Sequence, residues 1–119
     1  MFTTTKTNWV EEVRVLDTRT DGQTKPAKGS TRKVKLDLPA ELADAKAVTI
    51  TLTTAHASGE GFFSVWASGK RPNTSKLNVS VAGKAIANTT SVALDKDHSF
   101  NVYTSEGDHI IIDLIAVHS

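Results

Sequence analysis

The chain has 119 residues, a formal net charge of +1 and no cysteine. This length suits a single domain with one core, and the near-neutral charge gives no reason to expect nucleic acid or an anionic membrane as a partner. The lack of cysteine excludes disulfides, thiolate metal sites and cysteine nucleophiles.

The first nine residues, MFTTTKTNW, are polar and threonine-rich and end in a tryptophan. We predict that residues 1–9 form an N-terminal arm and that residues 10–119 form one β-sandwich domain. The segment lacks the basic-then-apolar order of a secretory signal, and no apolar run reaches the ~20 residues that span a bilayer. We therefore expect the protein to act in the cell that makes it, or to leave by lysis or within a particle. The candidate partner-binding residues of the arm are Phe2, Thr3, Thr4, Thr5, Lys6 and Trp9.

From residue 10 onward, apolar and polar residues alternate with a period of two, as in VKLDL and VTITLT. This pattern is typical of half-buried β-strands, and turn signals separate the runs at roughly the 8–12 residue spacing of sandwiches and barrels. The pattern predicts strands near residues 10–17, 31–38, 47–54, 61–67, 76–82, 88–94, 98–104 and 108–117, with a turn or two of helix after Pro39. The last strand is the most apolar, as expected of a central strand buried on both faces. We predict an all-β, antiparallel, jelly-roll-like β-sandwich of about eight strands.

The hexamer RVLDTR, residues 14–19, places two arginines and an aspartate beside apolar side chains. Such a cluster suits a catalytic or ligand-binding site, and it equally suits an ion pair that fixes the end of a strand. Because no nucleophile or metal ligand accompanies the hexamer, we predict a structural network in which Asp17 pairs with Arg19 or Arg71. This network would hold the loop of residues 18–30 against the sandwich.

Other candidates for catalytic chemistry are weak. The four histidines have none of the spacings of a zinc site, and the acidic pairs at residues 95–97 and 106–108 fall in apparent hairpin turns. We therefore predict no catalytic residue, no metal and no cofactor, and we expect a protein that is not an enzyme.

The segment GFFSVWASGKRPNTSKLNV, residues 61–79, contains three of the aromatic residues followed by arginine and asparagine. Aromatic rings with nearby amide and guanidinium groups are typical of a sugar-binding face. The alternative is that Trp66 packs against the body of the domain. The candidate ligand-binding residues are Trp66, Arg71 and Asn73.

Taken in order, RVLDTR, GFFSVWASGKRPNTSKLNV and the closing HIIIDLIAV resemble a β-domain common in actinobacterial secreted proteins and in phages of those bacteria. The resemblance extends from Val13 to nearly the end of the chain. Ala67 stands where that family usually has proline, and AVHS replaces its closing glycine-tyrosine. The residues that match the family motifs are Arg14, Asp17, Thr18, Arg19, Arg71, Pro72, Ser75, Leu77, Asn78 and Asp113.

The resemblance implies a binding or structural module without an agreed catalytic site. Combined with the lack of an export signal, it leads us to expect a phage virion protein that is assembled in the host cytoplasm. The first interpretation is a capsid decoration (cement) protein, favoured as a homotrimer, which binds the major capsid protein from outside through its arm. The alternative is a tail-associated module that binds carbohydrate on an actinobacterial surface. We expect neither nucleic acid nor membrane as a partner.

Overall fold

The computed structural model describes residues 6–20, 25–54, 60–72, 77–79 and 86–119. These residues form eight β-strands and one short 3-10 turn, η1, which lies where the sequence predicts helical residues after Pro39. Because η1 has three residues, no helix in the described part of the chain is long enough to cross a membrane. The elements are β1 (Thr7–Asp17), β2 (Ser30–Lys35), η1 (Ala40–Leu42), β3 (Ala47–Thr54), β4 (Gly61–Trp66), β5 (Leu77–Val79), β6 (Ile86–Ala93), β7 (Ser99–Thr104) and β8 (Ile111–His118).

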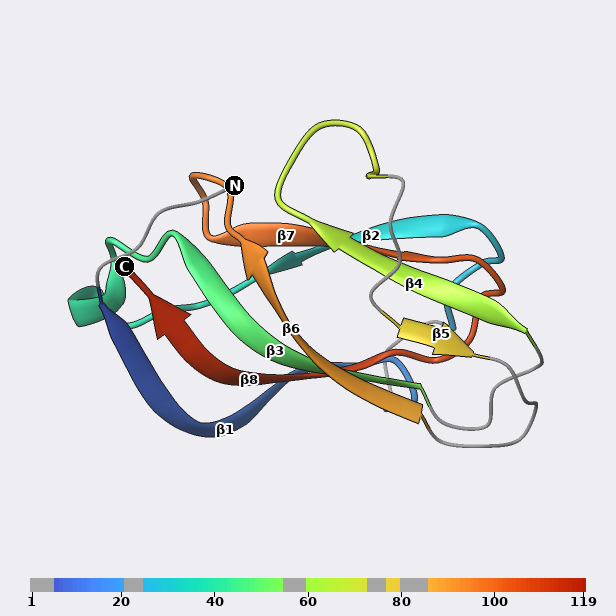
Figure 1. The fold of residues 1–119 in the computed structure, drawn as a ribbon, viewed down its shortest axis with the longest axis horizontal. Helices are drawn as coiled ribbons and strands as arrows, with labels where there is room; N and C mark the ends of the chain where they lie inside the picture. The colour runs from blue at the N-terminus through green and yellow to red at the C-terminus, as the bar shows by residue number, and fades with distance from the viewer. Residues whose placement is uncertain (1–5, 21–24, 55–59, 73–76, 80–85) are drawn as a thin grey trace.

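The strands form two four-stranded antiparallel sheets that face each other (Figure 1). Sheet A has the order β1-β8-β3-β6 and sheet B has the order β2-β7-β4-β5. The chain crosses between the sheets at most connections, and the first and last strands lie side by side. This is the strand order of a jelly roll, so the predicted all-β, jelly-roll-like sandwich is confirmed.

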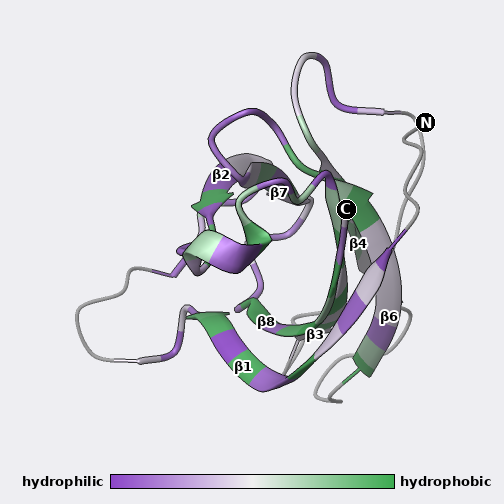
Figure 2. Ribbon diagram, turned by 90° about the vertical axis from the view of Figure 1, so that its left-hand side faces the viewer, coloured by the Kyte–Doolittle hydropathy of each residue, from purple (hydrophilic) through white to green (hydrophobic). Residues whose placement is uncertain are grey.

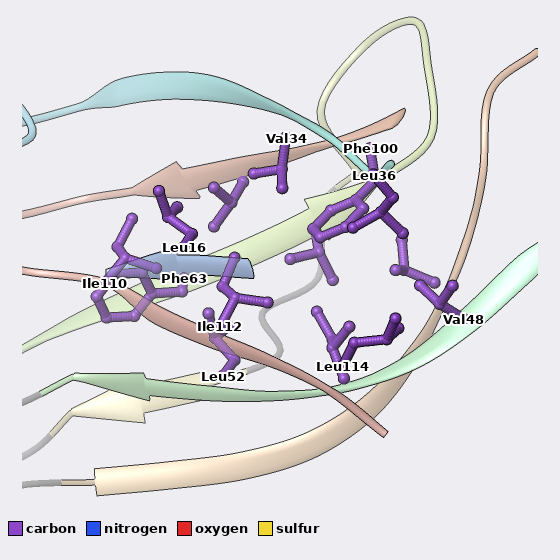
Figure 3. Close-up of a cluster of buried hydrophobic side chains, with 14 of the residues drawn as sticks. Leu16, Val34, Leu36, Val48, Leu52, Phe63, Phe100, Ile110, Ile112 and Leu114 are labelled. Carbon is purple, nitrogen blue, oxygen red and sulfur yellow. The ribbon is translucent and has the colours of Figure 1, made fainter. Parts of the chain in front are cut away.

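Side chains from the inner faces of both sheets fill the space between them (Figure 3). Phe63 of β4 and Phe100 of β7 are almost completely buried, and each contributes roughly 1.5–3 kcal/mol through loss of contact with water. β8 is buried over most of its length, because it lies between β1 and β3 in sheet A and its inner face packs on the core. This confirms the prediction of a central strand. Other core residues are Leu16, Val34, Leu36, Val48, Ile50, Leu52, Val65, Leu77, Val92, Val102, Ile110, Ile112, Leu114 and Val117.

β1 is an edge strand of sheet A and bends strongly along its length (Figure 1). Trp9 is opposite Ala116 and Val13 is opposite Leu114, so β1 uses four residue steps where β8 uses two. Such a bulge bends the strand and changes the direction of its side chains. The middle of β1 is therefore less tightly attached to the sheet than its ends.

The predicted boundary between arm and domain is wrong for residues 7–9. β1 begins at Thr7, and the backbones of Lys6 and Ser119 exchange two hydrogen bonds of 3.1 and 2.9 Å. Trp9 is therefore part of a paired strand. The other predicted arm residues, at positions 2–5, lie outside the described residues.

Other strand limits differ slightly from the predictions. β2 ends at Lys35, because Leu36 N already donates to His98 O in the neighbouring turn. β8 begins at Ile111, three residues later than predicted, because Ile110 is still bonded to Thr18 of the RVLDTR hexamer. Of the strand predicted near residues 76–82, the structure describes Leu77–Val79.

Candidate functional site

The first arginine of the hexamer lies on the outer face of sheet A, at the β1–β8 ladder. Arg14 is directly opposite Asp113, and its Nε donates to Asp113 Oδ1 over 3.0 Å. The Asp113 side chain is only 9% exposed, whereas that of Arg14 is 53% exposed. This hydrogen bond raises the pKa of Arg14 above its usual value. The pair therefore neutralises a buried carboxylate and ties the edge strand to its neighbour.

Asp17 lies between the two arginines of the hexamer. Its Oδ2 accepts a hydrogen bond from Arg19 Nη2 over 2.9 Å and lies 3.5 Å from Arg14 Nη1. Its Oδ1 accepts from both the backbone N and the Nε of Arg19. The hydrogen bonds from Arg19 lower the pKa of Asp17 to about 2. The expected Asp17–Arg19 pair is thus present.

Thr18 points inward and fixes the connection into β8. Its hydroxyl is 2.9 Å from His109 Nδ1 and accepts from Ile110 N over 2.8 Å. Its backbone N donates to Ile110 O over 3.0 Å. Because Thr18 is 2% exposed, these bonds satisfy a buried hydroxyl at the point where the chain leaves β1. The hexamer therefore acts as a clasp between the end of β1 and the start of β8.

The geometry of this clasp suits structure better than catalysis. Asp17 and Asp113 are each held by a guanidinium, and an open recess of about 280 Å³ beside them is lined by Arg14, Val15, Leu16, Asp17 and Thr20. A general base needs a free carboxylate or imidazole with a pKa near the working pH, whereas Asp17 has a lowered pKa. Within the described residues, no group of three or more His, Cys, Asp or Glu side chains is placed to hold a metal ion.

A second surface lies on the opposite side of β1 and was not anticipated from the sequence. An apolar groove of about 200 Å³ separates β1 from the segment that joins β2 to η1. Its walls are Val10, Val13, Val15, Leu36, Asp37, Leu38, Pro39, Leu42 and Leu114. Figure 2 views this side of the molecule and shows hydrophobic positions in green along β1. The bulge in β1 explains the groove, because it moves the middle of the strand away from the elements that would otherwise cover it.

Two large apolar side chains of β1 are exposed next to this groove. Trp9 is 76% exposed and Val13 is 51% exposed, and they are the exposed large hydrophobic residues among those the structure describes. Trp9 faces the outer side of sheet A, opposite Ala116, whereas Val13 lines the groove. The free edge of β1 therefore carries apolar side chains on both of its faces.

One acidic residue lines the groove, and three more are next to lining residues in the sequence. Glu11 and Glu12 occupy the bulge between Val10 and Val13, Asp37 lines the groove, and Glu41 lies in η1 next to Leu42. The four carboxylates make no ion pair within the described part of the chain. The lining of the groove is thus apolar apart from Asp37, and Glu11, Glu12 and Glu41 adjoin it along the chain; these four residues are called its acidic rim.

The third surface is the outer face of sheet B, where the sequence placed the candidate ligand residues. Arg71 lies over the ring of Tyr103, with its Cζ 4.0 Å from the ring centroid, and 5.7 Å from the centroid of Phe62. Trp66 is on the same face, half-buried, and its Nε1 donates to Gly69 O over 3.1 Å. Arg71 therefore holds the loop after β4 onto the sheet through cation–π contacts. It does not pair with Asp17, which was one of the two expected partners.

Two predicted site residues remain from the segment of residues 61–79, namely Asn78 and Asn73. Asn78 is exposed on β5, opposite Phe62 of β4, and so belongs to the outer face of sheet B. Asn73 lies outside the described residues. The sequence analysis missed Tyr103, which contributes the ring under Arg71.

No family model and no curated protein matches this chain. Among solved structures, the chain is similar to part of the N-terminal endo-1,4-β-D-xylanase 10B of Clostridium thermocellum, which was determined as CBM22-1–GH10 modules with xylohexaose. The TM-score is 0.44, the sequence identity is 11%, and the match covers 95% of this chain and 25% of the xylanase chain. This chain thus spans about a quarter of that protein. A likeness at this level gives no basis for assigning a function.

Proposed function

We propose that this chain is a structural interaction protein that docks on other proteins through the edge of β1. The observation that supports the proposal is the apolar groove between Val10 and Leu42, which the exposed Val13 lines, together with the exposed Trp9 on the outer side of β1. Exposed apolar surface next to polar residues is typical of protein interaction sites. Tryptophan is also the residue type most enriched among side chains that dominate binding energy.

The free edge of β1 strengthens this proposal. An unpaired edge presents backbone N–H and C=O groups to a partner strand, and natural proteins usually protect long edges. β1 has 11 residues and pairs on one side with β8. Its bulge and its glutamates limit indiscriminate pairing, whereas Trp9 and Val13 provide apolar contacts for a specific partner.

The more specific proposal is a virion protein, namely a capsid decoration protein that binds the major capsid protein from outside. It is supported by the resemblance of the hexamer and the closing strand to domains in actinobacteriophage proteins. A non-enzymatic role also agrees with the clasp geometry, in which arginines hold both motif carboxylates. The protein would then work by burying apolar surface between subunits at the particle surface.

The test is binding to purified particles that lack this chain. The wild-type chain should co-sediment with the particles, and the variant Trp9→Ser/Val13→Ser should lose most of this binding. Lys70→Ser, in the exposed loop after β4, is the matched surface control and should bind like the wild type. If the double variant folds and still binds like the wild type, β1 is not the docking surface.

Quantitative immunoblotting of complete particles then distinguishes a capsid location from a tail location. A decoration protein should match the copy number of the capsid subunit.

One observation favours a second candidate function, the binding of surface carbohydrate. The outer face of sheet B gathers Phe62, Trp66 and Tyr103 with the polar groups of Asn101 and Arg71. Because Arg71 already lies over the Tyr103 ring, a pyranose would stack on Trp66, with the guanidinium beside it as a donor. Calorimetric titration with oligosaccharides from an actinobacterial cell wall tests it. Trp66→Ala should remove binding, and no heat for the wild-type chain would rule out this candidate.

A further inference from the structure

We infer that the apolar groove on β1 receives the N-terminal segment of a second copy of this chain, with the Phe2 side chain inserted. The inference rests on the proposed function, because it names the partner of the same surface. It assigns a specific role to the sequence MFTTTK that precedes β1. The argument depends on the size, the charge and the position of the groove.

The size of the groove suits one large side chain. Its volume of about 200 Å³ is below the ~300 Å³ at which pockets for small-molecule ligands begin. Its lining is aliphatic, apart from Asp37, and gives few polar groups that would orient a polar ligand. An aromatic side chain carried by an extended segment fits these properties well. Phe2 is such a side chain.

The charge of the rim selects a segment without acidic residues. Asp37 lines the groove, and Glu11, Glu12 and Glu41 are next to lining residues in the sequence. These four residues have no ion-pair partner within the described residues. The sequence MFTTTK contains no acid and ends in Lys6. In an extended chain, Lys6 is about 13 Å from Phe2. When Phe2 of one copy enters the groove of another, Lys6 is therefore close enough to approach the acidic rim.

The same segment also suits pairing with the free edge of β1. The three consecutive threonines at positions 3–5 are β-branched and favour an extended backbone. Strand addition at an edge provides main-chain hydrogen bonds, and a pocket for one side chain provides specificity. The groove and the edge lie next to each other on β1.

The position of the groove favours a second copy over the same chain. Lys6 is fixed to Ser119 by two backbone hydrogen bonds, so the chain enters β1 from the end of the sheet. A two-residue hairpin placed just before Lys6 would bring Phe2 only as far as Thr7. The groove begins at Val10, beyond that point. Insertion into the groove of a neighbour needs no such reversal.

Site-specific disulfide trapping tests the inference, because the natural chain has no cysteine. Two single variants of the full chain, Thr3→Cys, which keeps Phe2, and Val13→Cys, are mixed and oxidised, and the 1:1 product is identified by mass spectrometry. A disulfide needs Cα atoms within about 7 Å, so it reports direct proximity. Thr3→Cys mixed with Thr89→Cys, an exposed position on β6, is the matched control. We expect about tenfold more product than in the control, which corresponds to a contact worth about 1.4 kcal/mol.

Three outcomes decide the matter. Excess product between the two single variants supports exchange between copies. Product no more abundant than in the control overturns the inference of exchange. A disulfide that forms only within one chain of the double variant Thr3→Cys/Val13→Cys at high dilution also overturns it. Failure of this inference is distinct from failure of the proposed function. If trapping fails while Trp9→Ser/Val13→Ser still loses particle binding, then β1 docks on another protein.

Discussion

Arg14 and Asp113 face each other across the β1–β8 ladder, with Arg14 Nε 3.0 Å from Asp113 Oδ1. Asp113 is buried in sheet A, and the guanidinium that neutralises it lies on the edge strand. The ion pair therefore ties β1 to β8 on the outer face of sheet A, where Trp9 is also exposed, whereas the groove lies on the other side of β1.

We predict that Arg14→Met lowers the free energy of unfolding, because it leaves the Asp113 carboxylate buried without its partner. Urea denaturation followed by tryptophan fluorescence measures the loss. In the double variant Arg14→Met/Asp113→Asn the uncompensated charge is gone, so part of the loss should be recovered. Equal destabilisation by the single and the double variant would show that the charge pairing is unimportant.

The pKa of Asp17 predicts a pH dependence of stability. Because Arg19 lowers this pKa to about 2, the contribution of Asp17 is fully present above its unfolded pKa near 3.8 and is lost as the pH falls towards 2. Asp17→Asn should therefore cost about 1 kcal/mol at pH 7 and progressively less below pH 4. Urea denaturation at several pH values measures the difference between variant and wild type.

The comparison with the variant is needed because a second carboxylate titrates in the same range. Lys33 lowers the pKa of Asp97 to about 2 in the turn between β6 and β7. Asp97 is unchanged in Asp17→Asn, so its contribution cancels in the difference. A difference that stays constant from pH 7 to pH 2 would contradict the assigned role of Asp17.

The fold was predictable because its determinants are local. Alternation in segments such as VTITLT, with turn residues between them, indicates both the strands and their buried faces. The strand ends were less predictable, because contacts far apart in sequence set them. β8 begins late because Ile110 is bonded to Thr18, which lies 92 residues earlier in the chain.

One feature of the sequence does indicate the groove, but the strand prediction, which relied on alternation with a period of two, did not use it. In Val10-Glu11-Glu12-Val13, two apolar residues are three positions apart, which breaks the period of two. Both valines can face the groove only if the strand contains a bulge. The contact between Arg71 and Tyr103 had no such local signal, because the sheet topology brings β7 under the loop after β4. That is why the sequence analysis named Arg71, beside Arg19, as an alternative partner of Asp17.

The contact between Arg71 and Tyr103 predicts protection of the loop after β4 from trypsin. Tyr103→Leu removes the ring under the guanidinium, a loss of about 0.5–1 kcal/mol, so cleavage after Lys70 should become roughly two- to fivefold faster. Mass spectrometry of timed digests gives the rate. Tyr103→Phe keeps a ring for the cation and should be cleaved like the wild type. If the two variants are cleaved equally fast, the ring does not hold the loop.

Two glycines provide a final prediction, because they share a backbone conformation and differ in surroundings. Gly69 and Gly107 have backbone φ values of 77° and 73°, which residues other than glycine rarely adopt. A Cβ at Gly69 would meet no atom within 4 Å, whereas one at Gly107 would lie 2.8 Å from Pro26 O and 2.9 Å from Lys28 N. Gly69→Ala should therefore cost only about 1 kcal/mol for the strained backbone. Gly107→Ala should cost about 2–4 kcal/mol, because the segment of residues 26–28 must also move. Thermal unfolding of both variants measures the two effects, and equal losses would mean that this segment is not packed against the turn before β8.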